Sequence, residues 1–254
     1  MLTKTQQNNE LFTQKLYLQI FRKTLVSYDS SNWSAILVDS LFKEFFIKTL
    51  FYDGEYFKND FKITQRFTIL EILSKNLNLI TNEFDGLINF YEKLSTDFLV
   101  YFYRHEKNFE DLNYLNDLFL EIKMTLVCIN DASSGNENED SVREQIQKSE
   151  LVLRNTCKIL NQVHSNEIIK TNFNKMLIKE ESMLIDGYVN LKLELIRFIG
   201  ILVFENEYNR NIVQETKALR TIIENVNIDI NNPFIREWSI VTLRHLYYSK
   251  SPLN

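Results

Sequence analysis

The chain has 254 residues, of which only five are glycine and two are proline, whereas average composition would supply about 30 of these two residue types. Sheet folds use glycine and proline at hairpins, bulges and crossovers, so this scarcity argues against sandwiches, barrels and dinucleotide-binding α/β folds. Hydrophobic residues make up 44% of the chain, which excludes disorder throughout, and the formal charge of -5 provides no basic field to attract nucleic acid.

Apolar residues recur at three- and four-residue intervals from Glu10 onward, which is the spacing of amphipathic helices. Polar turns and capping residues separate the successive helical patterns. The predicted helices, in chain order, are 11–28, 33–50, 61–77, 84–102, 109–130, 142–163, 165–178, 181–206, 209–226 and 233–249. Helix pairs of about 40 residues succeed one another, a period typical of helical solenoids. The sequence therefore predicts an all-α solenoid.

One polar segment interrupts the helical pattern. The run DASSGNENED at 131–140 holds no large apolar residue, and Ser141 with Glu144 forms a capping box that would start the next helix. We predict N-terminal helical repeats at 1–130, an acidic flexible loop at 131–141 and C-terminal repeats at 142–254. An insertion in a continuous helical stack explains the loop best, because no proline or long Gly/Ser tract accompanies it. A linker between two domains is the alternative.

The last quarter of the chain carries two uncommon motifs. The first is LELIRFIGIL at 193–202, followed by NRN at 209–211, and the second is NIDINNPFIREWSI at 227–240. Their order and spacing resemble the C-terminal armadillo-like domain of the ataxin-10 family, over roughly residues 190–247. A fungal branch of that family is named copper transport protein 86. The resemblance implies an armadillo-like solenoid.

The resemblance also implies a binding surface. In armadillo repeats the third helix lines a concave groove, which here would be lined by Trp238, Val241 and His245 together with Glu194, Arg197 and Ile201 of the preceding repeat. The asparagine ladder of peptide-binding armadillo grooves does not carry over, because His245 and Ile201 stand at those positions.

The start of the last helix adds a further candidate. Asn232 is expected to cap this helix, with Pro233 at its first position. Arg236 in its first turn opposes the helix dipole, so we expect it to pair with Glu194 or Glu205 of the neighbouring repeat. Ile240, Leu243 and Tyr247 lie on another side of the helix from the groove residues, and one of the two sets should be core.

No constellation of residues predicts catalysis, a cofactor or a metal site. His105, His164 and His245 fall on separate predicted helices, and no Ser, Cys or Asp is spaced to form a triad with them. Cys128 and Cys157 form no CxxC pair, and the four methionines form no MxxM cluster. Gly200 has a packing role, since within a helix it permits the close approach of a neighbouring helix.

The function predicted from the resemblance is a non-enzymatic, cytoplasmic scaffold that binds other proteins and acts in cytokinesis and cell division. Two isolated cysteines fit a reducing compartment. The longest apolar runs are far shorter than the roughly 20 residues that span a bilayer, and nucleic acid is not an expected partner. Assembly into a homo-oligomer stays open. The alternatives are a copper-homeostasis factor that binds metal and an enzyme with an unrecognised site.

Overall fold

The computed structural model describes residues 84–106, 112–133, 139–171, 187–227, 232 and 234–247. The chain divides into two compact units, Met1–Gly86 and Leu87–Asn254. The three helices predicted before residue 84 lie outside the described residues. Within these ranges the elements are all helices, which confirms the all-α prediction there: α6 (Phe84–His105), α7 (Leu112–Ala132), α8 (Glu139–Ile146), α9 (Glu150–Ser165), α11 (Leu191–Val203), α12 (Glu207–Glu215), α13 (Ala218–Glu224) and α14 (Ile235–Tyr247).

Two predicted helices are each divided by a turn. The helix predicted at 142–163 is α8 followed by α9, because Ser149 starts a new helix and its Oγ accepts a hydrogen bond from the Val152 amide at 3.3 Å. The helix predicted at 209–226 is α12 followed by α13, with Lys217 in the left-handed conformation at φ 63°. Neither turn contains glycine or proline, so rules based on those residues predicted no break.

The polar segment at 131–141 is helical at both of its ends. Helix α7 continues to Ala132, which is buried, and Ser133 is also buried with its Oγ bonded to the Ile129 carbonyl at 2.7 Å. Helix α8 begins at Glu139, so Ser141 lies inside the helix that it was predicted to cap. Helix α7 packs against α11, and therefore helices from both sides of this segment belong to one compact unit.

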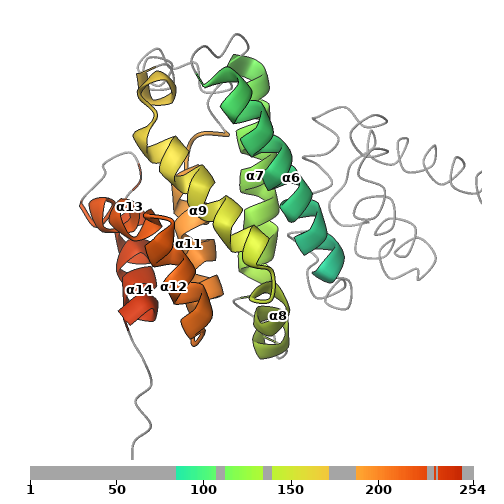
Figure 1. The fold of residues 1–254 in the computed structure, drawn as a ribbon, viewed down its shortest axis with the longest axis vertical. Coiled ribbons are helices and arrows are strands. Elements are labelled where there is room, and N and C mark those ends of the chain that lie inside the picture. The colour runs from blue at the N-terminus through green and yellow to red at the C-terminus, as the bar shows by residue number, and fades with distance from the viewer. Residues whose placement is uncertain are drawn as a thin grey trace, which may run out of the picture. The chain divides into compact units, whose positions relative to one another are not determined.

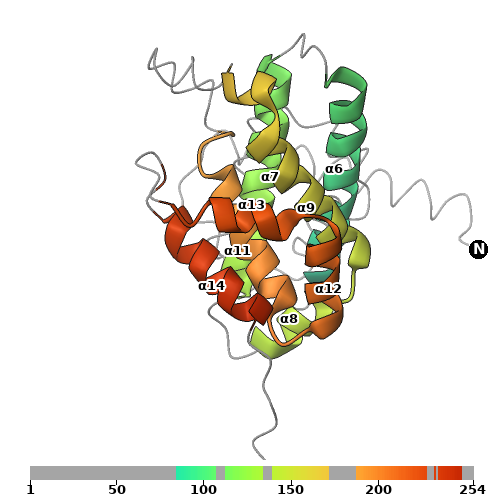
Figure 2. The same ribbon diagram turned by 60° about the vertical axis from the view of Figure 1, so that its left-hand side comes forward.

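Helices α7, α11 and α14 form one row, which Figures 1 and 2 show from two sides. Asn116 accepts a hydrogen bond from the Gly187 amide at 3.1 Å, and Asn130, farther along α7, donates to Glu194 of α11 at 2.9 Å. The two helices therefore run in the same direction. Helix α14 continues the row by packing against α11.

Helices α6, α9 and α13 form a second row. Ser149 donates to Glu92 at 2.7 Å and Asn155 to Ser95 at 3.1 Å, which joins α9 to α6. At the other side of α9, its polar residues bond to α13 and the turn before it: Asn161 to Thr216 and Thr221, and His164 to Glu224. The two rows meet where α9 packs on α11.

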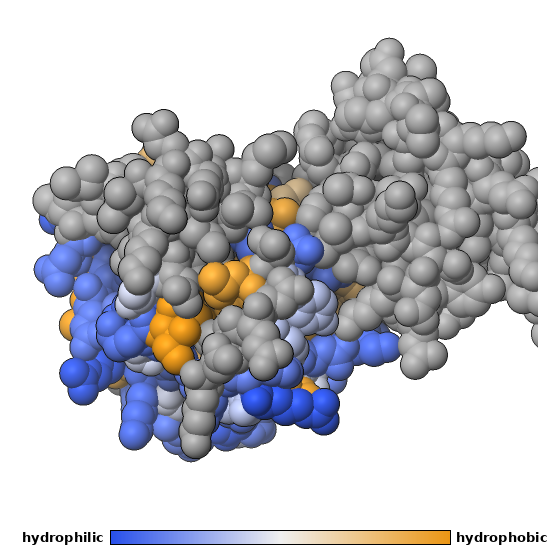
Figure 3. Space-filling view, turned by 90° about the horizontal axis from the view of Figure 1, so that it is seen from above, coloured by the Kyte–Doolittle hydropathy of each residue, from blue (hydrophilic) through white to orange (hydrophobic). Residues whose placement is uncertain are grey.

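Aromatic side chains fill the core between the rows. The largest fully buried side chains are Tyr91, Phe98, Phe102, Phe119 and Phe198. The rings of Phe98 and Phe119 lie 5.5 Å apart between α6 and α7, and those of Tyr91 and Phe198 lie 5.4 Å apart between α6 and α11. On the face that Figure 3 shows, the surface is largely hydrophilic with separate apolar patches.

Candidate protein-binding face

The candidate face depends on the close approach of α11 and α14. A Cβ atom added at Gly200 would lie 2.6 Å from Oγ1 of Thr242, so only glycine allows this separation of the helices. Thr242 Oγ1 donates to the Ile196 carbonyl at 3.0 Å. The packing role predicted for Gly200 is thus confirmed, and the contact fixes which side chains of the two helices meet.

The buried side of α14 is neither of the two sets predicted from the sequence. Its buried residues are Ile235, Ser239, Thr242 and Leu246. The expectation that one of the two predicted sets forms the core side of the helix is therefore wrong. Ser and Thr were not counted as apolar, yet their small side chains fit between close helices. The other residues lie on two flanks of this buried stripe, one with Trp238, Val241 and His245 and the other with Ile240, Leu243 and Tyr247.

Arg197 joins three helices at one end of the first flank. Its guanidinium lies 2.8 Å from Asp131 of α7, 3.8 Å from Glu194 of α11 and 5.1 Å from the ring centroid of Trp238 of α14. A second nitrogen donates to the Asn130 carbonyl at 3.4 Å. The sequence analysis assigned Arg197 and Trp238 to one groove without pairing them, and in the structure the two side chains are in contact. The charge of Arg197 is compensated within the fold.

Glu194 is also engaged within the fold. Asn130 Nδ2 donates to Glu194 Oε2 at 2.9 Å and to the Glu194 carbonyl at 3.2 Å. Burial raises the pKa of the Glu194 carboxyl, while the bond from Asn130 and the charge of Arg197 lower it. Glu194 and Arg197 therefore position the face by linking α7 and α11.

His245 and Phe204 form a second cluster at the other end of the flank. The Nδ1 of His245 lies 3.0 Å from the Gly200 carbonyl, which can only accept, so Nδ1 carries the proton. The His245 ring meets the Phe204 ring edge-on at 4.8 Å, and the guanidinium of Arg143 lies 4.5 Å from the Phe204 centroid. Arg143 of α8 and His245 of α14 thus both contact Phe204, the residue that follows α11.

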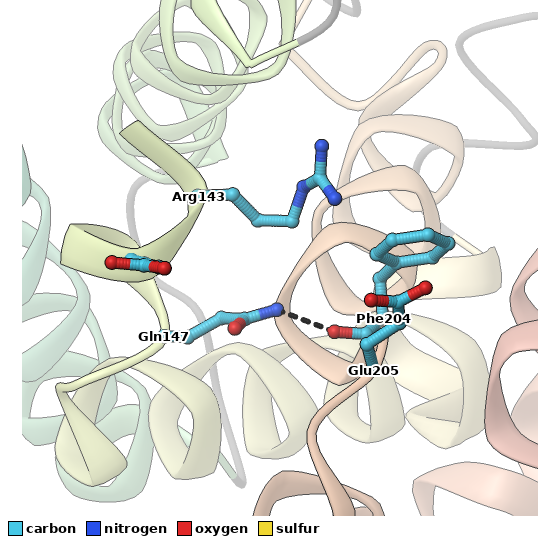
Figure 4. A pocket seen from close by; sticks show the side chains of 5 residues that line it. Arg143, Gln147, Phe204 and Glu205 are labelled. Carbon is cyan, nitrogen blue, oxygen red and sulfur yellow. Dashed lines mark hydrogen bonds between the residues drawn. The ribbon is translucent and has the colours of Figure 1, made fainter. Parts of the chain in front are cut away.

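A pocket of about 440 Å³ opens beside this second cluster, lined by Arg143, Glu144, Gln147, Phe204 and Glu205 (Figure 4). Gln147 Nε2 donates to the carbonyls of Ile201 and Phe204, at 3.0 and 2.8 Å. These bonds satisfy carbonyl groups at the C-terminus of α11. The pocket walls are therefore built on a fixed helix end.

We define the α11–α14 face as the half-buried residues that lie between and within these clusters: Ile201, Phe204, Trp238, Val241 and His245. Arg236 does not join them. It is exposed on the far flank of α14 and forms no ion pair with any residue that the structure describes, so its predicted pairing with Glu194 or Glu205 is wrong. The carboxylate of Glu194 lies nearer to Arg197 instead.

The predicted cap of α14 is also absent. Asn232 Oδ1 is buried and accepts no hydrogen bond from described residues, whereas the Asn232 carbonyl accepts from the Ile235 amide at 3.2 Å. The sequence analysis missed four residues that position the face, namely Asn130, Asp131, Arg143 and Gln147. Their side chains come from α7, α8 and the turn after α8, and no motif or spacing marked them.

The described residues give no support to copper binding or to a histidine-based site. Across these ranges no group of three or more His, Cys, Asp or Glu could hold a metal ion. Cys128 and Cys157 are buried, and burial raises the pKa of the Cys157 thiol to about 12, which disfavours the thiolate that binds soft metals. No helix in the described part of the chain is long and apolar enough to cross a membrane.

Comparison with known proteins identifies relatives of the C-terminal part. Residues 191–252 match the family described as the spinocerebellar ataxia type 10 protein domain. The chain is 38% identical to an ataxin-10 homolog of Dictyostelium discoideum over 55 residues, which is 22% of the chain and 9% of that protein. It is 40% identical to Homo sapiens ataxin-10 over 55 residues, or 22% and 12% of the two chains.

A longer match reaches a fungal relative. An ataxin-10 homolog of Kluyveromyces lactis is 26% identical over 122 residues, which is 47% of the chain and 20% of that protein. The matches to these three relatives thus span a fifth or less of their length. No solved structure matches the chain. The matched domain begins at the first residue of α11 and extends past α14, so it contains both helices of the α11–α14 face.

Proposed function

Because the chain carries the C-terminal domain of the ataxin-10 family, we propose that it is a non-enzymatic, protein-binding scaffold of the ataxin-10 type that acts in cytokinesis in the cytoplasm. The observation that carries this proposal is the coincidence of the matched residues 191–252 with the two helices of the α11–α14 face. Its partners are other proteins, and the proposal includes neither copper nor a catalytic step.

We further propose that the helices form an armadillo-like solenoid. Its support is the repeated pairing within each row, in which hydrogen bonds join residues 55 to 71 positions apart. Between α11 and α14, the last pair of helices in the first row, the separation falls to 46 positions, from Ile196 to Thr242. Such regular stacking of each helix on an earlier one is the arrangement of solenoid repeats.

The chemistry of the α11–α14 face suits a protein partner. Trp238 and Phe204 present aromatic surface, each beside an arginine, while Val241 and Ile201 lie between them. The arginine beside Trp238 is Arg197, which Asp131 and Glu194 hold in place. Aromatic residues held rigidly in this way are typical anchors of interfaces. Because the fold already engages Glu194 and Arg197, they support these anchors rather than contact the partner themselves.

Site-specific photo-crosslinking tests the face. We expect a benzoylphenylalanine placed at Val241 to crosslink to a discrete protein in dividing cells. The same group at Lys158, which is exposed on α9, is the matched control and should not capture that protein. Equal capture from both positions, or none from Val241 when both variants are folded by circular dichroism, would contradict the proposed face.

The role in cytokinesis needs a cellular readout. Depletion of the chain should raise the fraction of binucleate cells, and expression of the wild-type chain should return this fraction to its normal value. A variant with Val241→Asp should be expressed and folded but should fail to restore division, because a charge would be placed in the face. Normal division after complete depletion would refute the role, while the crosslinking result would still stand for the face.

A further inference from the structure

The far flank of α14 forms a second surface that the α11–α14 face does not include. Leu243 and Arg244 lie three and four residues after Ile240, and Arg236 and Tyr247 lie one turn farther toward either end, so the five residues share one side of the helix. Ile240 is 46% exposed and Tyr247 is 65% exposed. We call these five residues the α14 stripe.

Exposed apolar residues are concentrated at this helix. Among the described residues, nine large hydrophobic side chains are exposed, and three of them, Phe234, Ile240 and Tyr247, lie within 14 consecutive positions. Phe234 precedes α14 and by its spacing belongs to the flank of Trp238, whereas Ile240 and Tyr247 lie on the stripe. Single exposed apolar residues are ordinary on protein surfaces, but two on one side of a helix, with Leu243 between them, are typical of an interaction site. Leu243 is half-buried and extends the apolar part of the stripe toward the core.

Basic residues lie one turn to either side of Ile240. Arg236 and Arg244 are both exposed. Arg236 forms no ion pair within the described ranges, whereas Arg244 also interacts within the chain. The acidic residue in the same helix is Glu237 in the first turn. A helix that packs its apolar residues on Ile240 and Tyr247 would therefore place its flanking positions beside two guanidinium groups.

We propose that the α14 stripe is a docking surface for an amphipathic helix of a partner protein that carries Asp or Glu beside its apolar residues. Carboxylates at those positions complement Arg236 and Arg244, and the apolar side of such a helix covers Ile240 and Tyr247. The stripe and the α11–α14 face lie on opposite flanks of α14. One scaffold can therefore hold two proteins, and this inference does not depend on the first face.

A second copy of the chain fits the stripe less well than an acidic helix does. Two copies of α14 packed antiparallel about Ile240 would place Arg236 of each copy beside Arg244 of the other. Like charges at such positions oppose association. The charge pattern therefore favours a partner of opposite charge over self-association.

The test uses the full chain and two synthetic helical peptides that differ only in charge. Both have leucine at positions i, i+4 and i+7, and the flanking positions are glutamate in one and lysine in the other. Fluorescence anisotropy should show at least about tenfold tighter binding of the acidic peptide at low salt, a preference that shrinks as salt screens the charges. Equal binding of the two peptides, or no binding of either, would overturn the proposal.

Variants assign the binding to the stripe. The double variant Arg236→Glu with Arg244→Glu should bind the lysine peptide instead, and Ile240→Asp should bind neither, with circular dichroism as the control for folding. Val241→Asp on the other flank should leave peptide binding unchanged, which separates this inference from the proposed face. A concentration-dependent dimer that Ile240→Asp dissociates, or stripe-dependent binding to phosphatidylserine vesicles, would overturn the proposal in favour of self-association or a membrane.

Discussion

The contact between α6 and α7 and the contact between α11 and α14 join helices in two different ways. In the first, Phe98 and Phe119 meet with their ring centroids 5.5 Å apart, and both side chains are fully buried. In the second, Gly200 lies against Thr242, and the buried stripe of α14 includes Ser239. Large apolar area stabilises the first contact. Close approach and a hydroxyl-to-carbonyl bond define the second.

This difference determines how each contact responds to mutation. Loss of a large ring removes buried area and leaves a cavity, so the aromatic contact is sensitive to truncation. The α11–α14 contact has little side-chain volume to lose, and it is sensitive to added atoms instead. The helix pair that carries the α11–α14 face is therefore the one whose geometry a single methyl group can change.

The largest expected effect is at the aromatic contact. Phe98→Ala should lower the free energy of unfolding by about 3–5 kcal/mol, the usual cost of emptying a buried phenylalanine site. Urea denaturation of the full chain measures this loss. Val100→Ala, two residues along α6 at a side chain that is 45% exposed, is the matched control and should cost less than about 1 kcal/mol. Similar losses for both variants would show that Phe98 is not part of a packed core.

The opposite kind of change should disturb the second contact. Gly200→Ala raises helix propensity by about 1 kcal/mol, but its methyl group would overlap Thr242, so we expect a net loss of about 1–3 kcal/mol. The double variant Gly200→Ala with Thr242→Ala should recover much of this loss, because it removes the overlapping hydroxyl. A stabilised single variant would mean that the helices are farther apart than the structure has them.

These two contacts also show what a sequence can and cannot predict. Large residues at helical spacing identified α6 and α7, because burial of Phe and Leu dominates the pattern. The same rule failed at α14, where Ser239 and Thr242 are buried although they are polar. The predicted role of Gly200 was correct because a glycine inside a helix is costly without a packing reason.

The candidate face was predicted in part. The resemblance to armadillo repeats assigned Arg197 and Trp238 to one groove, but their direct contact is seen only in the structure. The contributions of Asp131 and Gln147 could not be predicted, because they depend on how α7 and α8 approach the ends of α11. The position of Arg236 also depends on the rotation of α14, which the small buried residues determine.

A smaller effect is expected from Trp238, whose half-buried ring belongs to both the fold and the proposed interface. Trp238→Ala should cost about 1–2 kcal/mol, because it removes the cation–π contact with Arg197 and only part of a buried ring. Urea denaturation gives this cost, and crosslinking from Val241 reports partner capture. Loss of capture with this modest cost would support the face. A loss as large as that of Phe98→Ala would make Trp238 a core residue.

The smallest expected effect is a pH dependence at the contact between α9 and α13. Burial lowers the pKa of His164 below its ordinary value of 6.5, with Lys192 and Lys170 acting in the same direction and Glu224 opposing them. The unfolded chain therefore binds a proton at His164 more readily than the folded chain does. The contribution of His164 to stability is fully present above pH 6.5 and is lost as the pH falls from 6.5 through the lower pKa of the folded state.

His164→Gln should accordingly lose less stability than the wild type between pH 7 and pH 5, because glutamine does not titrate. Glu224→Gln should have the opposite effect. Glu224 accepts from His164 Nε2 at 2.8 Å and favours the protonated ring, so its removal lowers the pKa of His164 further and steepens the loss. Urea denaturation at several pH values measures how steeply the free energy of unfolding falls between pH 7 and pH 5. The fall should be steepest for Glu224→Gln, intermediate for the wild type and shallowest for His164→Gln. If His164→Gln has the steepest slope, protonation of His164 stabilises the fold, and the ion pair with Glu224 outweighs burial.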